Sequence, residues 1–424
     1  MKILVCIRQG LDGEINPFDA SAYEEALKIK GAEVTLLSMG PLSAKDFLLS
    51  LTRLGAKKAI LLSDKAFAGA DTLATAYTLS LAVNKIKPDL IFCGRQTLVG
   101  DTAQTGSMLS ALAKTGLITN VMSIDEIGDS ITCTTRDEGV QTVAFPALLT
   151  VERINTLRLP SILSKTGEVV IWSAEDIGAN AEKCGLSGSP TRVVKTFENE
   201  SGKRKCKFVS ISELPKIIED ALNNKKENII KATSGEQKLS KVVIVGDGPR
   251  PFAETVSDDI TVLPLTNADD LAQKIGELSP NAVLWGSDSL SKKLSSQVAA
   301  KLKLGLCADC TLLETDGNEL YMYRPALSGS VIAKIISRTK PAMATVRTVQ
   351  SGADIMVAAG YGAREALNTV KAFAEKYSAE LVTTRKMVDN DILPYNMQVG
   401  LTGKTVSPPV YVAVGVSGAV HHIA

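Results

Sequence analysis

Hydrophobic positions in the first 95 residues follow two alternating periods. Short aliphatic runs, typical of buried strands, occupy Ile3–Ile7, Glu33–Ser38, Ala59–Leu62 and Leu90–Cys93. Segments with helical spacing lie between them, at Ser21–Lys30, Ser43–Leu54 and Thr72–Asn84. Strands that alternate with helices predict βαβ units, in which helices cover both faces of a parallel sheet.

The pattern changes after Asn120, where strand-like runs follow one another with only turn residues between them. These runs occupy Ser130–Thr135, Gln141–Ala144 and Ala147–Val151. They predict an antiparallel edge that closes the first domain, which is expected to span residues 1–185.

Residues 186–238 contain too few apolar side chains for a core of their own. Gly185–Lys207 reads as an extended arm, Ile211–Asn223 as an amphipathic helix and Lys231–Lys241 as a solvated linker. The arm and the helix either dock a partner protein or wrap the other half of the molecule, and the sequence favours neither.

An internal repeat begins beyond this linker. Pro88-Asp-Leu-Ile-Phe-Cys-Gly94 recurs 192 positions later as Pro280-Asn-Ala-Val-Leu-Trp-Gly286. Leu117-Ile-Thr-Asn120 recurs 189 positions later as Leu306-Cys-Ala-Asp309. The run that starts at Pro146 recurs 195 positions later at Pro341. Near-constant offsets indicate two copies of one α/β domain. The second copy is expected over residues 239–350.

Residues 351–424 form a third, smaller unit. Strand-like runs at Asp354–Ala358, Glu380–Val382 and Val410–Val414 accompany a helical segment at Ala363–Tyr377, in flavodoxin-like order. The fold class predicted for the chain is α/β, with two homologous doubly wound parallel sheets of the adenine nucleotide alpha hydrolase-like kind. A flavodoxin-like third domain follows, and we expect it to be truncated before its sheet is complete.

Charge and composition exclude several kinds of partner. Lys plus Arg (47) nearly balance Asp plus Glu (46) and aromatic residues make up only 4% of the chain, so neither a strong basic field nor a base-stacking surface is predicted. No run approaches the roughly 20 apolar residues of a membrane span. Seven cysteines at scattered positions indicate reduced thiols. We therefore expect a cytoplasmic protein that binds neither nucleic acid nor membrane.

The loop Gly94–Gly106, with the sequence Gly-Arg-Gln-Thr-Leu-Val-Gly-Asp-Thr-Ala-Gln-Thr-Gly, lies between a predicted strand and a predicted helix. Free N–H groups at a helix start favour an anion, so this loop is a candidate diphosphate site; an ordinary connecting loop is the alternative. The second copy lacks these glycines, which favours a ligand in the first copy alone. Asp71, Thr72 and Thr75 are expected to add polar groups at the same sheet edge.

Three other motifs point to weaker alternatives. Thr402-Gly-Lys-Thr405 has the end of a P-loop, but Gln398 stands where the first glycine belongs. Gly415-Val-Ser-Gly-Ala419 lacks the last glycine of a hydrolase nucleophile elbow. His421 and His422 are the only histidines, and neighbouring helix positions point about 100° apart, so a cofactor contact is expected there and no metal site.

Longer segments resemble the electron transfer flavoproteins, with a beta-subunit-like half followed by an alpha-subunit-like half in one chain. The nucleotide site of the beta subunit is resembled by the segments Phe67–Ala76 and Cys93–Gly106. The first domain of the alpha subunit is resembled by Ala308–Thr311, Arg324–Ala326 and Pro341–Arg347. The flavin domain of the alpha subunit is resembled by Gln398–Val406 and Gly415–His422. The resemblance covers nearly the whole chain and accounts for the repeat, because the two subunits share a homologous domain.

The resemblance implies a carrier that binds FAD and passes electrons from a dehydrogenase to an acceptor. It assigns Arg385 to the isoalloxazine ring, Thr402 to flavin N5 and His422 to flavin O2, and these three are the expected catalytic contacts. The other flavin contacts that we expect are Gln398, Gly400, Gly403, Lys404, Ser417, Gly418 and His421. Positive charge on Arg385 and His422 would stabilise a reduced, anionic flavin.

In the beta-like half, the resemblance implies a loop that holds AMP in simple members of the family and a second FAD in electron-bifurcating members. The complete expected site comprises Cys6, Asp71, Thr72, Thr75, Gly94, Gln96, Gly100, Asp101, Thr102, Gln104, Thr105 and Gly106. The sequence of this loop is closer to the bifurcating type, for which NADH is a further candidate substrate. The protein is expected to be an oxidoreductase in its own right only in that case.

Several positions depart from the family pattern. Tyr361 stands where the family has the arginine of a Gly-Arg-Gly turn, Leu401 replaces the glutamine before Thr402, and His421 replaces a glutamine. A flavin dehydrogenase of the acyl-CoA dehydrogenase type is the expected electron donor or acceptor. The alternative is a nucleotide-binding relative that has lost stable flavin and acts as an interaction or sensor module.

Overall fold

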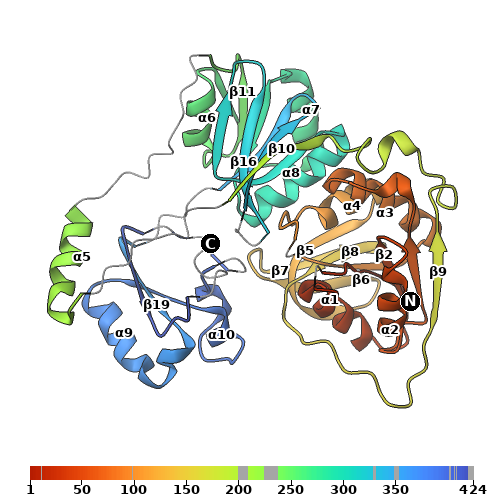
Figure 1. The fold of residues 1–424 in the computed structure, drawn as a ribbon, viewed down its shortest axis with the longest axis horizontal. Helices are drawn as coiled ribbons and strands as arrows, with labels where there is room; N and C mark the ends of the chain where they lie inside the picture. The colour runs from red at the N-terminus through yellow and green to blue at the C-terminus, as the bar shows by residue number, and fades with distance from the viewer. Residues whose placement is uncertain are drawn as a thin grey trace. The chain divides into compact units, whose positions relative to one another are not determined.

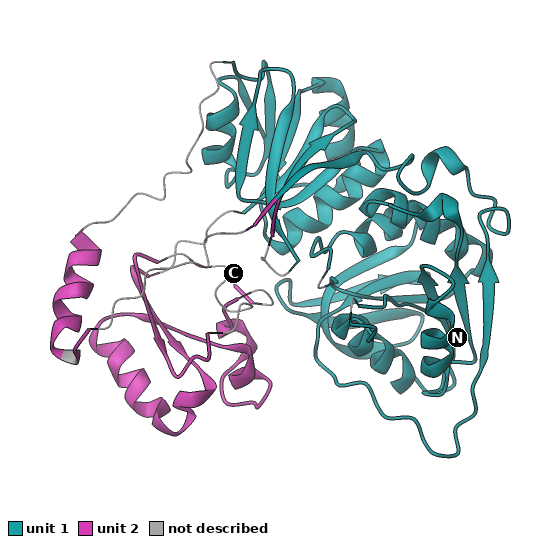
Figure 2. Ribbon diagram, viewed as in Figure 1, with its two compact units in different colours: residues 1–196, 233–327, 333–347 teal, residues 197–232, 328–332, 348–424 magenta. Residues whose placement is uncertain are grey.

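A computed structural model describes residues 1–10, 12–97, 99–198, 209–223, 237–327, 331–347, 353–400, 403–404, 406 and 408–418. The chain forms two compact units, coloured teal and magenta in Figure 2. Unit 1 comprises residues 1–196, 233–327 and 333–347, and unit 2 comprises residues 197–232, 328–332 and 348–424.

The first repeat of unit 1 (residues 1–185) is built on a nine-stranded sheet (Figure 1). Its strands are β1 (Lys2–Cys6), β2 (Glu33–Met39), β3 (Lys58–Leu62), β4 (Leu90–Gly94), β5 (Gly116–Ile127), β6 (Ser130–Thr135), β7 (Val140–Ala144), β8 (Ala147–Val151) and β9 (Glu168–Trp172). Their order across the sheet is β7-β6-β5-β8-β4-β1-β2-β3-β9. The pairs from β5 to β9 are parallel, whereas β6 and β7 continue the sheet antiparallel. The predicted antiparallel edge is therefore confirmed for Ser130–Thr135 and Gln141–Ala144. It is wrong for Ala147–Val151, which forms β8, a fully buried strand between β5 and β4 that pairs in parallel with both.

Helices of the first repeat connect the parallel strands. They are α1 (Pro17–Lys28), α2 (Ala44–Thr52), α3 (Thr72–Ile86) and α4 (Thr105–Ala113), with the short 3-10 turns η1 (Lys65–Phe67) and η2 (Ala181–Lys183). Helix α1 begins four residues before the predicted start at Ser21, because Pro17 occupies the first turn, where its missing N–H costs nothing. Asp71 caps α3 by accepting a hydrogen bond from the Ala74 N–H at 3.0 Å.

The second repeat (residues 239–347) has a five-stranded parallel sheet and a separate four-stranded sheet. Its elements are β11 (Val242–Val245), α6 (Arg250–Val256), β12 (Ile260–Leu263), α7 (Ala268–Leu278), β13 (Ala282–Trp285), α8 (Ser289–Leu302), β14 (Leu306–Cys310), β15 (Leu312–Thr315), β16 (Leu320–Ala326), β17 (Val331–Ser337) and β18 (Ala342–Val346). The parallel sheet has the order β12-β11-β13-β18-β14.

The two repeats have the same topology. The order β2-β1-β4-β8-β5 in the first repeat matches β12-β11-β13-β18-β14 in the second, strand for strand. Matched residues also share an uncommon backbone conformation, since Asn120 (φ 58°) and Asp309 (φ 57°) are both left-handed. Each donates its N–H to a threonine hydroxyl of the neighbouring strand, Thr150 at 3.0 Å and Thr345 at 2.8 Å. The structure therefore has the internal repeat that the sequence predicts.

The equivalent helices α4 and α8 pack against each other, so the repeats share one hydrophobic core. Met108 and Leu109 of α4 belong to the same buried cluster as Leu294 and Val298 of α8. Burial of these side chains, worth roughly 1.5–3 kcal/mol each, joins the two repeats into one compact unit.

The predicted arm is partly a strand of the second repeat. Strand β10 (Thr191–Glu198) adds to the edge of the four-stranded sheet, whose order is β10-β17-β16-β15. Just before it, the Pro190 carbonyl accepts a hydrogen bond from the Arg338 N–H at 2.7 Å. This part of the arm therefore wraps the other half of the molecule, as one of the two sequence-based alternatives proposes; residues 199–207 lie outside the described part.

Unit 2 contains a three-stranded parallel sheet in the order β20-β19-β21. Its elements are η4 (Ile211–Glu213), α5 (Leu214–Asn223), β19 (Ile355–Ala359), η5 (Tyr361–Ala366), α9 (Leu367–Lys376), β20 (Glu380–Thr383), α10 (Arg385–Val388), η6 (Tyr395–Met397) and β21 (Val410–Val414). The predicted helix at Ala363–Tyr377 divides into η5 and α9, and the predicted long loop contains α10. None of the described helices is long and apolar enough to cross a membrane.

Candidate functional site

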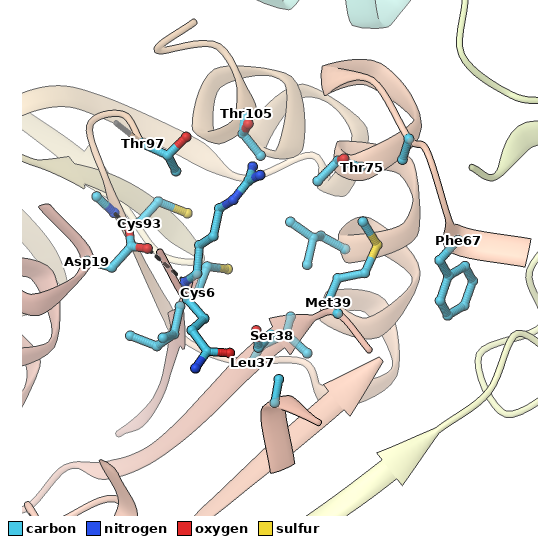
Figure 3. A pocket seen from close by; sticks show the side chains of 18 of the residues that line it. Cys6, Asp19, Leu37, Ser38, Met39, Phe67, Thr75, Cys93, Thr97 and Thr105 are labelled. Atoms are coloured by element: carbon cyan, nitrogen blue, oxygen red, sulfur yellow. Dashed lines mark hydrogen bonds between the residues drawn. The ribbon is translucent and has the colours of Figure 1, made fainter. Parts of the chain in front are cut away.

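A cavity of about 1000 Å³ opens at the carboxyl ends of β1, β2, β3 and β4 in the first repeat (Figure 3). Cys6 closes β1, Ser38 and Met39 close β2, and Cys93 closes β4 next to Gly94. Figure 3 shows Cys6, Cys93 and Asp19 together on one side of the cavity and Thr75 and Thr105 on helices above it. Small-molecule sites of open α/β sheets occupy this edge, so the cavity is the candidate binding site of the first repeat.

Most residues predicted for the beta-like site line this cavity. These are Cys6, Thr75, Gly94, Gln96, Thr102, Gln104, Thr105 and Gly106. Asp71, Thr72, Gly100 and Asp101 are not on its wall. The Asp71 carboxylate is occupied, because besides capping α3 it accepts hydrogen bonds from the N–H and the hydroxyl of Thr191 at 2.9 and 2.7 Å.

Two glycines bring the loop and helix α4 close to the sheet. A Cβ on Gly94 would lie 2.6 Å from the backbone carbon of Phe18, and a Cβ on Gly106 would lie 2.5 Å from a methyl group of Thr150. Because α4 begins at Thr105, its free N–H groups lie beside the cavity. This arrangement suits an anionic group at the helix start.

Gln104 has the most informative environment on the cavity wall. Its side chain is 1% exposed, and neither amide atom has a hydrogen-bond partner among the described residues. An unsatisfied buried amide costs about 1–3 kcal/mol, whereas a polar ligand in the cavity would supply its partners. Gln104 is therefore a cavity-wall residue with unmet hydrogen-bonding capacity.

Asp19, which the sequence analysis missed, supports the loop from below. Its carboxylate accepts hydrogen bonds from the N–H groups of Arg8 at 2.8 Å and Gly94 at 3.1 Å. Burial raises the pKa of Asp19 from 3.8 to about 7, although these hydrogen bonds, the side-chain hydrogen bond with Asn16 and the Arg8 charge oppose the rise.

Arg8 is a second missed residue, since it lines the cavity with an exposed side chain. It follows β1 closely, as Gly94 closes β4, and β1 and β4 are neighbours in the sheet. The strand-end rule that identified Gly94 would also have identified Arg8, had it been applied to every predicted strand.

A pair of thiols forms another part of the wall. Cys6 and Cys93 lie on the neighbouring strands β1 and β4 and are both free. The hydrogen bond between the two thiols, together with burial, raises the pKa of Cys93 well above its usual value. The Cys93 thiol is thus kept in its neutral form, while the α4 side of the cavity favours negative charge.

In unit 2, the described residues predicted for the flavin gather at the carboxyl edge of the three-stranded sheet. Arg385 begins α10 just after β20, and its Nε lies 3.1 Å from Oδ2 of Asp389. Gln398 is buried and bridges to Thr383 of β20. Ser417 and Gly418 follow β21. Gly400, Gly403 and Lys404 lie in the same segment as Gln398, whereas Thr402, His421 and His422 are outside the described residues.

The glycine turn at this edge fits a dinucleotide. Gly415 has φ +65°, and a Cβ on it would lie 2.3 Å from the backbone nitrogen of Ala363, so the turn after β21 packs closely on the start of η5. Gly418 has φ +75°, with no described atom within 4 Å of its Cβ position. A close backbone turn with an open side at the end of a parallel strand is the geometry that nucleotide-binding sheets use.

Tyr361 occupies the position where the family pattern has arginine, and positive charge remains beside it. The Lys386 ammonium lies 4.4 Å from the centre of the Tyr361 ring, and the Arg364 guanidinium lies 4.6 Å from it. Cations on an aromatic face are stabilised by its quadrupole. Among the described residues, no group of three or more His, Cys, Asp or Glu side chains is arranged to hold a metal ion.

Comparison with known proteins covers both units. The electron transfer flavoprotein domain family matches residues 3–177 and 255–374, and the electron transfer flavoprotein FAD-binding domain family matches residues 351–424. Protein FixA of Azorhizobium caulinodans is 41% identical over 227 residues, which are 49% of this chain and 81% of FixA. Electron transfer flavoprotein subunit beta of Clostridium acetobutylicum is 40% identical over 205 residues, 46% of this chain and 79% of the subunit.

A third relative, the Caffeyl-CoA reductase-Etf complex subunit CarD of Acetobacterium woodii, is 41% identical over 204 residues, which are 45% of this chain and 78% of CarD. Beta-type relatives thus account for about half of the chain, and the FAD-binding domain family accounts for its last 74 residues. Together these matches show that the chain belongs to the electron transfer flavoprotein family, as a fusion of beta-like and alpha-like parts.

Proposed function

We propose that this protein carries electrons on FAD bound in unit 2, between a flavin dehydrogenase and an acceptor. The match to the FAD-binding domain supports FAD as the cofactor. FAD supplies the capacity to take up and release electrons. We propose that Arg385, which follows β20 at the carboxyl edge of the sheet, stabilises negative charge on the flavin. We propose the same role for His422 and a hydrogen bond from Thr402.

We propose that the cavity of the first repeat holds an adenine nucleotide, either AMP or a second FAD. The orphaned amide of Gln104 at the start of α4 carries this proposal. A volume of about 1000 Å³ is at the upper end of the range for small-molecule sites, so it accommodates a dinucleotide as well as a mononucleotide. The neutral Cys93 thiol suits contact with a base or ring, and the start of α4 suits phosphate.

The first experiment counts cofactors. Purified protein is denatured, the released nucleotides are separated by chromatography, and FAD and AMP are quantified per chain. Two FAD support electron bifurcation, and one FAD with one AMP supports a simple carrier. Absence of flavin after incubation with FAD contradicts the carrier function and leaves the nucleotide-binding module, with an interaction or sensor role, as the function to pursue.

Two variants assign the counts to sites. Gln104→Leu removes the amide that a nucleotide would satisfy, so we expect nucleotide affinity in the first repeat to fall roughly tenfold or more while the protein without nucleotide becomes no less stable. Arg385→Met is expected to lower flavin retention in unit 2 and to leave the first-repeat nucleotide in place. Loss of the same cofactor in both variants would contradict the assignment of one ligand to each unit.

NADH use is a separate proposal, tied to the bifurcating alternative. The loop Gly100–Gly106 has the sequence Gly-Asp-Thr-Ala-Gln-Thr-Gly, which resembles that type. Anaerobic addition of NADH would bleach the flavin absorbance if the protein oxidises NADH. An unchanged spectrum in protein that contains two FAD would rule out NADH as the donor.

The proposed partner is a flavin dehydrogenase of the acyl-CoA dehydrogenase type in the cytoplasm. CarD, a relative of the first half, is named as a subunit of a complex with a caffeyl-CoA reductase, which supports a partner that acts on CoA esters. The loop between β8 and β9 exposes Leu159, Ile162 and Leu163 to 89–96%, and such clustered exposed apolar side chains favour protein contacts. Ile162→Glu is expected to slow flavin reduction by an acyl-CoA dehydrogenase and its substrate, whereas Val140→Glu, at an exposed apolar position on β7, is the matched control.

A further inference from the structure

Three segments of the second repeat remain without a role in either binding site. They are Ala308–Thr311, Arg324–Ala326 and Pro341–Arg347, the same segments that resemble the alpha subunit. In unit 1 they meet at the junction with the first repeat. The Asp309 carboxylate accepts hydrogen bonds from Arg347 at 2.6 and 3.1 Å and lies 3.8 Å from the Lys292 ammonium.

Arg324 reaches from this cluster into the first repeat. Its side chain on β16 is buried, with 6% exposure, and its Nη2 donates a hydrogen bond to the backbone carbonyl of Asp101 at 3.0 Å. The two residues are 223 positions apart in the sequence. The Arg324 Nε is buried and has no hydrogen-bond partner among the described residues, so the Nη2 bond to Asp101 is the contact that offsets the cost of burying this guanidinium.

The residue that Arg324 holds shapes the nucleotide loop. Asp101 has the left-handed conformation, with φ +51°, which is uncommon for a residue other than glycine. Its N–H donates to the Thr97 carbonyl at 2.9 Å, and its carboxylate accepts a hydrogen bond from the Gln96 amide at 2.7 Å. Gln96 and the residues that follow Asp101, from Thr102 to Gln104, line the cavity. A displaced Asp101 would therefore move the cavity wall, although Asp101 itself is not on it.

An equivalent contact runs in the opposite direction, from the first repeat to the second, which indicates that the arrangement belongs to the repeat architecture. Arg136, the residue directly after β6, lies 188 positions before Arg324, close to the offsets of the repeat. Its Nη2 donates to the hydroxyl of Ser289, the first residue of α8, at 3.3 Å. Arg324 of the second repeat thus contacts the loop that precedes α4, and Arg136 of the first repeat contacts the first residue of α8. The segment held by Arg324 borders the cavity whose wall includes the orphaned Gln104 amide.

We propose that Arg324 is a positioning residue of the first-repeat nucleotide site, supplied by the alpha-like part of the chain. The inference rests on the proposed binding of an adenine nucleotide in that cavity. Arg324 does not touch the nucleotide. It holds Asp101 in the left-handed turn, so that the loop 96–105 is already shaped when the nucleotide arrives and little ordering is required on binding. The alpha-like part thereby sets the affinity of a site that lies entirely in the beta-like part.

The test compares AMP binding by full-length protein and four variants, after bound nucleotide has been removed. Arg324→Met keeps the length and packing of the side chain but removes its donors, and we expect the dissociation constant for AMP to rise about tenfold or more. Arg324→Lys, which retains one donor, is expected to recover most of the affinity. Two variants serve as controls. Ser289→Ala loosens the equivalent contact made by Arg136, and Arg338→Met removes an exposed arginine of the same repeat as Arg324. In both, the dissociation constant for AMP is expected to stay within twofold of that of the unchanged protein.

Hydrogen exchange separates positioning from general destabilisation. In Arg324→Met, backbone amides of residues 97–105 are expected to exchange faster, while the flavin spectrum of unit 2 and the exchange of the core strands stay unchanged. Wild-type affinity together with unchanged loop exchange in Arg324→Met would overturn the inference. AMP and FAD that fail to bind the cavity even in the unchanged protein would instead overturn the proposed nucleotide site itself.

A measurement on the unchanged protein covers the case in which Arg324→Met does not fold. Coupling between two sites is reciprocal, so a nucleotide that orders the loop must also strengthen the contact with β16. AMP is then expected to slow amide exchange in the segment 320–326 of the second repeat as well as in the loop. Slowing confined to the first repeat would contradict the coupling.

Discussion

Asp19 illustrates how one buried carboxyl can link the loop, the sheet and the pH response of unit 1. It is 5% exposed and receives the N–H groups of Arg8 and Gly94, which follow two neighbouring strands. Burial disfavours its charged form more than these hydrogen bonds stabilise it, so its pKa rises from 3.8 to about 7. Between these two values the folded protein holds a proton that the unfolded chain has already released.

This difference predicts that the stability of unit 1 falls as the pH rises from about 4 to about 7. A folded state that binds more protons than the unfolded state loses stability with increasing pH, and a shift of about three pKa units corresponds to roughly 4 kcal/mol over the window. Asp19→Asn removes the titration, so its midpoint of thermal unfolding should vary less with pH than that of the unchanged protein. Other carboxyl groups titrate in both proteins, and the comparison cancels them; superimposable profiles would show that Asp19 is not protonated in the folded state.

At the scale of elements, the first repeat depends on a close approach between strand β4 and helix α1. A Cβ on Gly94 would lie 2.6 Å from both the nitrogen of Asp19 and the carbon of Phe18, which are backbone atoms of α1 and cannot turn aside. By contrast, a Cβ on Gly128, in the connection between β5 and β6, would have no described atom within 4 Å. Replacing each of these two glycines by alanine is therefore expected to have different effects on the free energy of unfolding.

Gly94→Ala is expected to lower the free energy of unfolding of unit 1 by about 2 kcal/mol or more, because overpacking against backbone forces α1 away from the sheet. The same displacement would disturb the Asp19 contact beneath the loop, so nucleotide affinity should fall as well. Gly128→Ala is the matched control, and it should be neutral or slightly stabilising because alanine narrows the unfolded ensemble. Equal denaturation midpoints for the two variants would show that α1 and β4 are not held this closely in solution.

The elements that the sequence predicted well are those whose pattern is local. Alternation of aliphatic runs gives β1 to β4 within one or two residues, and the recurrence of Pro88–Gly94 at Pro280–Gly286 gives the second repeat. Arg8 follows a predicted strand and was within reach of the strand-end rule. Asp19, by contrast, was missed because its importance depends on strand order, which places β1 beside β4 although almost 90 residues separate them. The contact between Arg324 and Asp101 was beyond prediction for the same reason, since no motif records which residue of one repeat faces the other.

At the scale of the whole molecule, the chain contains two repeats that share a fold but differ at the start of one helix. The repeats share strand order and a hydrophobic core between α4 and α8. The glycine-containing loop that precedes α4 is replaced in the second repeat by Ser287 and Asp288, and Asp288 caps α8 through a hydrogen bond to the Ser291 N–H at 2.9 Å. A helix start whose N–H group is satisfied by its own side chain offers less to an anion, which explains why a ligand is expected in the first repeat alone.

The division into two units leads to a last prediction, that AMP and FAD stabilise different parts of one chain. A ligand stabilises the unit that binds it by RT ln(1 + [L]/Kd), about 2.7 kcal/mol at a hundredfold excess over Kd, and gives no such stabilisation to a unit that unfolds independently. In calorimetry of the full chain we expect two transitions, since unit 1 and unit 2 have separate cores. AMP should raise only the transition of unit 1.

FAD should raise the transition of unit 2, and it should raise that of unit 1 as well only if the cavity accepts a dinucleotide. Gln104→Leu supplies the control. A roughly tenfold weaker Kd should reduce the stabilisation of unit 1 by either ligand from about 2.7 to about 1.4 kcal/mol at the same ligand concentration, and the response of unit 2 to FAD should stay intact. A single transition that both ligands shift equally would mean that the two units unfold together. In that case a cofactor bound to one unit would stabilise the other unit through cooperative unfolding of the whole chain. The contact between the two repeats of unit 1 would not be needed to explain that coupling.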